Sequence, residues 1–173
     1  GHQLQILGRC YRDAIMDCGV DFDGLFGPAY KGIPLASSVA VAFAEEGRDY
    51  PVSFNRKEAK DHGEGGIMLG APLNGRVLAI DDVVTAGTAV RGSVDFIKNQ
   101  GASLCAFCVA VDRQERGREG LGSALSELSE TFELVSISIV TLDDILAFAS
   151  DDPRIADDIA PRIEAYRAQY GAL

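Results

Sequence analysis

Short apolar runs of strand length alternate along this chain with stretches of helical periodicity. The strand-like runs are FDGLF at 22–26, residues 51–55, 77–80 and 104–111, and LVSISIV at 134–140. Helical patterns cover residues 4–17, 33–47, 89–99 and 123–130, and two more open at Thr141 and at Asp152-Pro153. This alternation is typical of βαβ units. We therefore expect an α/β fold in a single domain, residues 1–173, with a parallel sheet covered by helices on both faces.

The overall charge limits the kinds of partner that the chain can bind. Its 173 residues carry a formal net charge of −10, which disfavours attraction to nucleic acid or to a membrane surface. No apolar run approaches the roughly 18 residues that a membrane helix needs. An anionic ligand must therefore be held by local positive groups.

A C-x-x-C pattern, Cys105 to Cys108, lies in the strand-like run LCAFCVAV. Residues three apart in a strand point to opposite faces, so these thiols cannot easily share one metal ion. No second cysteine pair completes a zinc site. We expect buried thiols, which suits a reducing, cytoplasmic environment.

The stretch VLAIDDVVTAGTAV, residues 77–90, joins two adjacent carboxylates to a turn of small residues that opens a helix. Free backbone N–H groups and hydroxyls at such a turn can seat a phosphate. The neighbouring carboxylates of Asp81 and Asp82 would accept hydrogen bonds from sugar hydroxyls. A ribose 5-phosphate satisfies both demands. The alternative is that the acids only end a strand and help to cap the helix.

This stretch resembles the phosphoribosyl diphosphate (PRPP) motif of the type I phosphoribosyltransferases. The resemblance implies a Rossmann-like core of parallel strands flanked by helices, with a flexible catalytic loop. It also implies that Asp81 and Asp82 hold the ribose hydroxyls and that the turn binds the 5′-phosphate. The implied PRPP contacts in this stretch are Asp81, Asp82, Val83, Val84, Thr85, Ala86, Gly87, Thr88 and Ala89.

A basic stretch, FNRKEAKDHGEGG, places Arg56, Lys57, Lys60 and His62 close to three glycines. A solvated surface loop is one interpretation. The other is a lid over an anion, because cations stabilise a departing pyrophosphate as its charge grows.

The same stretch resembles the catalytic loop of the orotate phosphoribosyltransferases, a branch of that family. In this branch the loop reaches into the active site of the neighbouring subunit of a homodimer. The resemblance implies that Arg56, Lys57, Lys60 and His62 contact PRPP in trans, with Lys60 the most important for rate. The implied catalytic residues are Lys57, Lys60, His62, Asp81 and Asp82.

Two further stretches follow strands and are expected at the same edge of the sheet. In FGPAYKG, Lys31 and exposed amides can bind an anion, although a plain turn is equally compatible. In VDRQERG, Arg113 offers a fork suited to a carboxylate, or it forms a surface pair with Glu115 or Asp112. The resemblance implies that Tyr30 and Lys31 contact PRPP and that Thr85 and Arg113 contact orotate.

The resemblance extends from about Leu4 to the C-terminus and implies a transfer of the 5-phosphoribosyl group from PRPP to orotate, which gives orotidine 5′-monophosphate and pyrophosphate in pyrimidine synthesis. It implies Mg²⁺ bound through PRPP, with Asp81 and Asp82 possible neighbours and no direct protein ligand. Family members usually carry a segment before the equivalent of Leu4. Either the sequence is trimmed or the protein is a fragment with a damaged base site, and we expect the 173-residue chain alone to be weakly active or inactive. Tyr166 and Tyr170 are expected in a core or an interface.

Two other functions remain compatible with the PRPP motif. One is a phosphoribosyltransferase for another base, and the other is a non-enzymatic regulator that senses PRPP on the same fold. A dinucleotide-binding oxidoreductase is disfavoured, because the G-x-G-x-x-G spacing is absent from the sequence.

Overall fold

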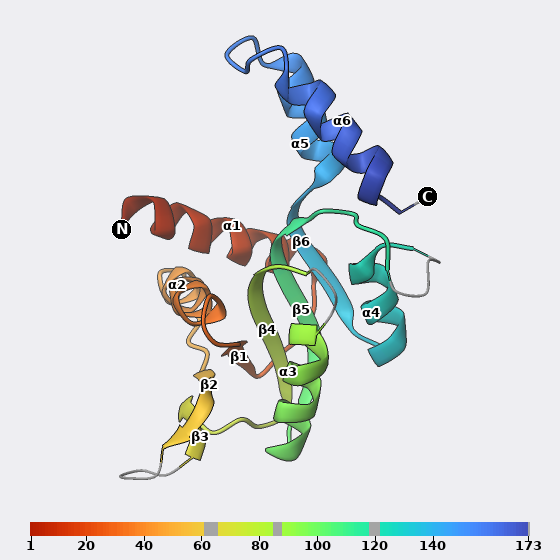
Figure 1. The fold of residues 1–173 in the computed structure, drawn as a ribbon. Coiled ribbons are helices and arrows are strands. Elements are labelled where there is room, and N and C mark those ends of the chain that lie inside the picture. Colours follow the sequence, from red (N-terminus) through yellow and green to blue (C-terminus); the bar gives the residue numbers. More distant parts are fainter. Residues whose placement is uncertain (61–65, 85–87, 118–121, 173) are drawn as a thin grey trace.

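A six-stranded mixed sheet in the order β3-β2-β1-β4-β5-β6 forms the centre of the molecule (Figure 1). This computed structural model describes residues 1–60, 66–84, 88–117 and 122–172, with positions 59, 60, 66, 88 and 89 described for the backbone alone. The strands are β1 (Gly24–Gly27), β2 (Val52–Lys60), β3 (Gly66–Gly70), β4 (Arg76–Val83), β5 (Ser103–Asp112) and β6 (Val135–Thr141). The helices are α1 (His2–Cys18), α2 (Gly32–Ala44), α3 (Thr88–Asn99), α4 (Ala124–Phe132), α5 (Leu142–Asp151) and α6 (Ile159–Tyr170).

The predicted parallel pairing is confirmed for five strands, from β2 through β1, β4 and β5 to β6. The edge strand β3, which we did not predict, pairs with β2 in the antiparallel direction. Strand β2 also continues to Lys60, so the first part of the expected lid, residues 56–60, is one arm of a hairpin. The three apolar residues of strand β3 stand between glycines and follow a polar stretch, so the sequence offered too short a pattern to predict it.

Two apolar clusters cover the two faces of the sheet, as predicted. Alternate residues of β4 face opposite ways: Leu78 and Ile80 join the cluster under α1 and α2, whereas Val77 and Ala79 join the cluster under α3 and α4. This alternation buries both faces of a central strand. It fixes the register in which β4 presents its last residues at the edge of the sheet.

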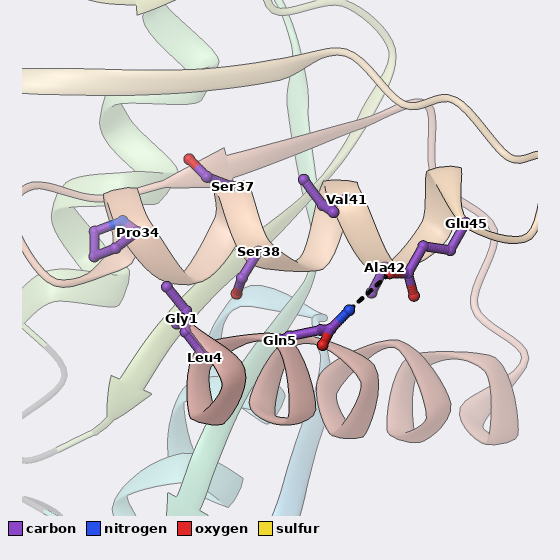
Figure 2. Close-up of a pocket in the computed structure, with 9 residues that line it drawn as sticks. All are labelled: Gly1, Leu4, Gln5, Pro34, Ser37, Ser38, Val41, Ala42 and Glu45. Atoms are coloured by element: carbon purple, nitrogen blue, oxygen red, sulfur yellow. Dashed lines mark hydrogen bonds between the residues drawn. The ribbon is translucent and has the colours of Figure 1, made fainter.

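Helices α1 and α2 lie side by side (Figure 1) because a glycine lets them approach closely. A Cβ at Gly8 would lie 2.6 Å from the backbone oxygen of Ser38. A pocket of about 430 Å³ lies between the two helices, bordered by Leu4, Pro34 and Val41 among others (Figure 2). Gln5 and Arg9 of α1 bind Glu45 at its rim.

The two thiols of the C-x-x-C pattern do not point to opposite faces, and that prediction is wrong. Strand β5 carries a register shift after Leu104, so that Cys105 and Cys108 both contact the cluster beneath α1 and α2. Both thiols are free, and Cys108 is fully buried. Burial raises the pKa of the Cys108 thiol.

Two helix ends carry residues that commonly mark such ends, and one predicted helix start is wrong. Gly19 ends α1 in the left-handed conformation, and Thr141 with Asp144 forms the capping box that opens α5. The last helix begins at Ile159 and not at Pro153, because turns occupy the intervening residues. Within the described part of the chain, no helix is long and apolar enough to cross a membrane.

Candidate functional site

Lys31 and Asp82 meet where two neighbouring strands end. Lys31 ends the β1–α2 loop, and Asp82 lies near the end of β4. The Nζ of Lys31 donates to Oδ2 of Asp82 over 2.6 Å. Since β1 and β4 are parallel neighbours, their carboxyl ends lie at the same edge of the sheet. The predicted convergence of these two stretches is therefore observed.

Close backbone approach shapes the β1–α2 loop. A Cβ at Gly27 would lie 2.4 Å from the oxygen of Gly32, and one at Gly32 would lie 2.7 Å from the oxygen of Ile80. The two glycines therefore permit a contact that side chains would block. The peptide bond between Ala29 and Tyr30 is cis. The side-chain oxygen of Asn55 accepts the N–H of Ala29 over 2.7 Å, which ties the loop to β2.

The pKa values of the two acids, Asp81 and Asp82, are shifted in opposite directions. Burial, together with repulsion from Asp82, raises the pKa of Asp81 to about 6, although a backbone hydrogen bond from Asp82 opposes this rise. Burial also raises the pKa of Asp82, but the hydrogen bond and attraction of Lys31 outweigh it and lower that pKa. The hydrogen bond to Asp82 raises the pKa of Lys31 in turn. Asp82 is thus the more readily ionised acid.

Tyr11 of α1 contacts the acid pair from the interior. Its side chain is fully buried, and its hydroxyl donates to the backbone oxygen of Asp81 over 2.7 Å. Burial raises the pKa of this hydroxyl strongly, so it stays a donor. Sequence pattern placed Tyr11 on the apolar face of a helix, where it cannot be told from an ordinary core residue.

Two of the predicted cations, Arg56 and Lys57, lie on β2, and Lys57 contacts Tyr30 of the β1–α2 loop. The Nζ of Lys57 lies 4.9 Å from the centre of the Tyr30 ring, whose side chain is 65% exposed. The Nη1 of Arg56 is shielded from solvent and has no hydrogen-bond partner among the described residues. The side chain of Lys60, and His62 altogether, lie outside the described residues.

The predicted phosphate turn is described only at its flanks. Val83 and Val84 are half-buried, and the backbone of Thr88 and Ala89 opens α3. Thr85, Ala86 and Gly87 lie outside the described residues. The helix of 12 residues behind the turn supplies the dipole expected at a phosphate seat.

Arg113 lies directly after β5, in the same region as Lys31 and Asp82. Its charge is close enough to Lys31 to oppose the rise in the pKa of that lysine, which the hydrogen bond to Asp82 causes. Its Nη2 lies 3.1 Å from Oε2 of Glu115, so the surface pair that the sequence left open is formed. Glu115 also accepts a hydrogen bond from Tyr166 of α6.

The sequence missed the contacts that Tyr11, Asn55 and Tyr166 make in this region. Tyr166 is not a core residue, because no side chain of α6 is buried. Only Glu115 was visible in the sequence, as a possible partner of Arg113. The tyrosine that donates to it, Tyr166, lies 51 residues away. Among the described residues no group of three or more His, Cys, Asp and Glu side chains could hold a metal ion.

Comparisons with known proteins agree on one family. The phosphoribosyl transferase domain model matches residues 3–137. Orotate phosphoribosyltransferases of Yersinia enterocolitica and Pseudomonas aeruginosa are each 54% identical, over 99% of this chain and 80% of theirs.

A solved orotate phosphoribosyltransferase of Francisella tularensis superposes with a TM-score of 0.84 at 32% identity, over 99% of this chain and 81% of its own. The adenine phosphoribosyltransferase of Thermoanaerobacter pseudethanolicus shares only the fold, with a TM-score of 0.52 at 14% identity over 80% of each chain.

Proposed function

The chain belongs to the phosphoribosyltransferase family, in its orotate branch, and we propose from this premise which residues carry out the reaction. The reaction transfers the 5-phosphoribosyl group of PRPP to orotate and yields orotidine 5′-monophosphate and pyrophosphate, a step of pyrimidine synthesis. The observation that carries the residue assignment is the convergence of Lys31, Asp82 and Arg113 at one edge of the sheet.

The acid pair binds the ribose. Carboxylates accept hydrogen bonds from the 2′ and 3′ hydroxyls, and the adjacent residues 83–89 wrap the 5′-phosphate at the start of α3. Asp82 is already ionised beside Lys31, and Asp81 ionises above a pKa of about 6. Tyr11 holds the backbone of Asp81 in place. The pair is thereby ready for hydroxyl groups at neutral pH.

The cations stabilise the leaving pyrophosphate. As the bond between the sugar carbon and pyrophosphate breaks, negative charge grows on the leaving group and positive charge on the ribose. Lys31 and Lys57 are exposed at the site, and Arg56 has a shielded N–H that lacks a partner among the described residues. Tyr30 positions Lys57 through its ring. Lys60 and His62 complete this set, and all four residues of the 56–66 stretch act on the PRPP of the partner subunit in a homodimer.

Arg113 and Thr85 bind orotate. The guanidinium of Arg113 matches a carboxylate in shape and charge, and its charge acts on Lys31, the partner of Asp82. This preference for an acidic base is what separates orotate from adenine on the shared fold.

The donor set fits Mg²⁺ carried by PRPP. Mg²⁺ keeps several waters and is held by one or two carboxylates together with substrate phosphates. The ion would be held through PRPP with Asp81 and Asp82 near it, and the described residues form no group of three or more His, Cys, Asp and Glu that could hold a metal. When bound, the ion neutralises charge on the pyrophosphate.

Three further features belong to the proposal. Residues 1–173 act as one domain. The protein works as a homodimer, with the 56–66 stretch acting in trans. It acts in the cytoplasm, where free thiols such as those of Cys105 and Cys108 persist.

Orotate turnover tests the proposal. The absorbance of orotate is followed with PRPP and Mg²⁺, using the full-length protein with whatever precedes Gly1. We expect loss of the orotate signal and no turnover of adenine or hypoxanthine. Turnover of a purine instead would overturn the base assignment, and PRPP binding without turnover of any base would favour a PRPP-sensing regulator.

A further inference from the structure

The end of the C-terminal helix is hydrogen-bonded to the loop that carries Arg113. The N–H of Arg116 donates to the oxygen of Tyr170 over 2.8 Å, and the N–H of Ala172 donates to the oxygen of Gln114 over 2.9 Å. Glu115 and Gly171 form an antiparallel bridge between these two bonds. Residues 114–116 therefore pair with residues 170–172, although no side chain of α6 is buried.

Side chains also connect this loop to α5. The amide of Gln114, which has a positive φ of 51°, exchanges two hydrogen bonds of 3.0 Å with Asp143 of α5. Asp143 also pairs with Arg167 of α6 over 2.7 Å. The loop is thus held between α5 and α6, and its conformation depends on both helices.

One carboxylate transmits this anchoring to Arg113. Oε1 of Glu115 accepts the hydroxyl of Tyr166, and its Oε2 accepts Nη2 of Arg113 over 3.1 Å. The Glu115 side chain is only 16% exposed, whereas that of Arg113 is 31% exposed. Each oxygen has a different donor, so loss of one donor lets the carboxylate turn and changes the direction in which it holds the guanidinium.

The three side chains are also reachable by a small molecule. They border a pocket of about 530 Å³ together with Arg116, Gln169 and Tyr170, a size typical of small-molecule sites. The hydrogen bond to Glu115 raises the pKa of Tyr166, which keeps its hydroxyl protonated as a donor.

We propose that Tyr166 is a positioning residue of the base site, which acts through Glu115 to aim Arg113 at the carboxylate of the incoming base. Glu115 occupies one N–H of the planar guanidinium and leaves its orientation defined for a second carboxylate. The proposal rests on the function proposed above and adds α6 to the determinants of base selectivity.

Steady-state kinetics of Tyr166→Phe in the full-length protein test this proposal. Because the variant removes only the hydroxyl, we expect the KM for orotate to rise about tenfold while the KM for PRPP changes by less than about twofold. In a Glu115→Ala background, which itself raises the KM for orotate, Tyr166→Phe has no further effect, since its target is gone.

Tyr170→Phe is the matched control. Tyr170 lies in the same helix, with its ring 4.9 Å from that of Tyr166, and its hydroxyl has no hydrogen bond among the described residues. We expect its kinetics and thermal midpoint to equal those of the wild type.

An unchanged KM for orotate, an equal rise for both substrates, or an undiminished effect in the Glu115→Ala background would overturn the proposal. The base assignment itself fails only if the wild type does not turn over orotate, so the two failures are distinguishable.

Discussion

The ammonium of Lys31 lies 2.6 Å from a carboxylate oxygen of Asp82, although the two residues are 51 positions apart. This contact joins the β1–α2 loop, which we propose to bind pyrophosphate, with the acid pair, which we propose to bind ribose. In the proposed site, substrate phosphate and ribose hydroxyls would compete for the two partners, so we expect bound PRPP to replace the ion pair with contacts to the substrate. The loop and the acid pair would then respond to PRPP together.

Lys31→Met removes the charge and keeps the length of the side chain. We expect kcat/KM for PRPP to fall roughly 10- to 100-fold, because a cation beside the leaving group is lost. The thermal midpoint should not change, since the Lys31 side chain is 72% exposed and exposed pairs add little stability. Lys98→Met, at an exposed position near the end of α3, is the control. Wild-type kcat/KM in the Lys31 variant would contradict its role.

Asp81→Asn should stabilise the protein at neutral pH and impair it as an enzyme. The folded pKa of Asp81, about 6, lies above the ordinary value of 3.8. The wild type therefore loses stability as the pH rises through that interval, because the buried carboxyl must ionise. We expect the thermal midpoint of the variant to exceed that of the wild type by roughly one to a few degrees at pH 7.

Below pH 3.8 both proteins carry a neutral side chain at this position, so the difference should vanish. Turnover should fall at least about tenfold, because the amide is a weaker acceptor for ribose hydroxyls. Thermal melts across this pH range check the first outcome. A variant that is less stable than the wild type at pH 7 would show that Asp81 is not disfavoured as a charge.

Tyr11→Phe deletes the hydrogen bond to the backbone oxygen of Asp81. The loss of a buried bond should lower the free energy of unfolding by about 1–2 kcal/mol, and a displaced acid pair should raise the KM for PRPP. Tyr50→Phe provides the comparison, because Tyr50 packs in the Phe22 and Phe43 aromatic group away from the acids. If both variants lower stability equally and neither alters the KM for PRPP, Tyr11 has only a packing role.

Gly8→Ala and Gly92→Ala should have opposite effects on stability. A Cβ at Gly8 would lie 2.6 Å from the backbone of Ser38, whereas one at Gly92 meets no atom within 4 Å. Overpacking at Gly8 should cost about 1–3 kcal/mol, and the better helix propensity of alanine should add about 0.5–1 kcal/mol at Gly92. Urea unfolding measures both. Equal effects would show that α1 and α2 are not closely packed at Gly8.

The parts of the fold that follow from local pattern could be predicted. The continuous apolar run of β4 and the helix that opens at Thr141 are local signals, and both structures formed as expected. Strand β3 was missed because pairing with β2 across a polar hairpin creates it. The cysteine orientation was wrong because a shift in register after Leu104 depends on the neighbouring strand.

The same distinction between local sequence signals and tertiary contacts applies to the candidate site. Asp81, Asp82, Lys31 and Arg113 could be found because residues after parallel strands gather at one edge of the sheet. Their supporting contacts could not be found, since Tyr11 lies 70 residues from the backbone oxygen that it binds and Tyr166 lies 51 residues from Glu115. Such pairs depend on tertiary packing, which no spacing rule in the sequence records.

A crystal structure of the full-length protein with PRPP and Mg²⁺ tests the central claim most directly. We expect the ribose hydroxyls within about 3 Å of the carboxylates of Asp81 and Asp82, the 5′-phosphate at the start of α3, and Lys31 turned from Asp82 towards the pyrophosphate. A sugar bound elsewhere, with the Lys31 ion pair intact and the start of α3 without phosphate, would contradict the assignment of this site.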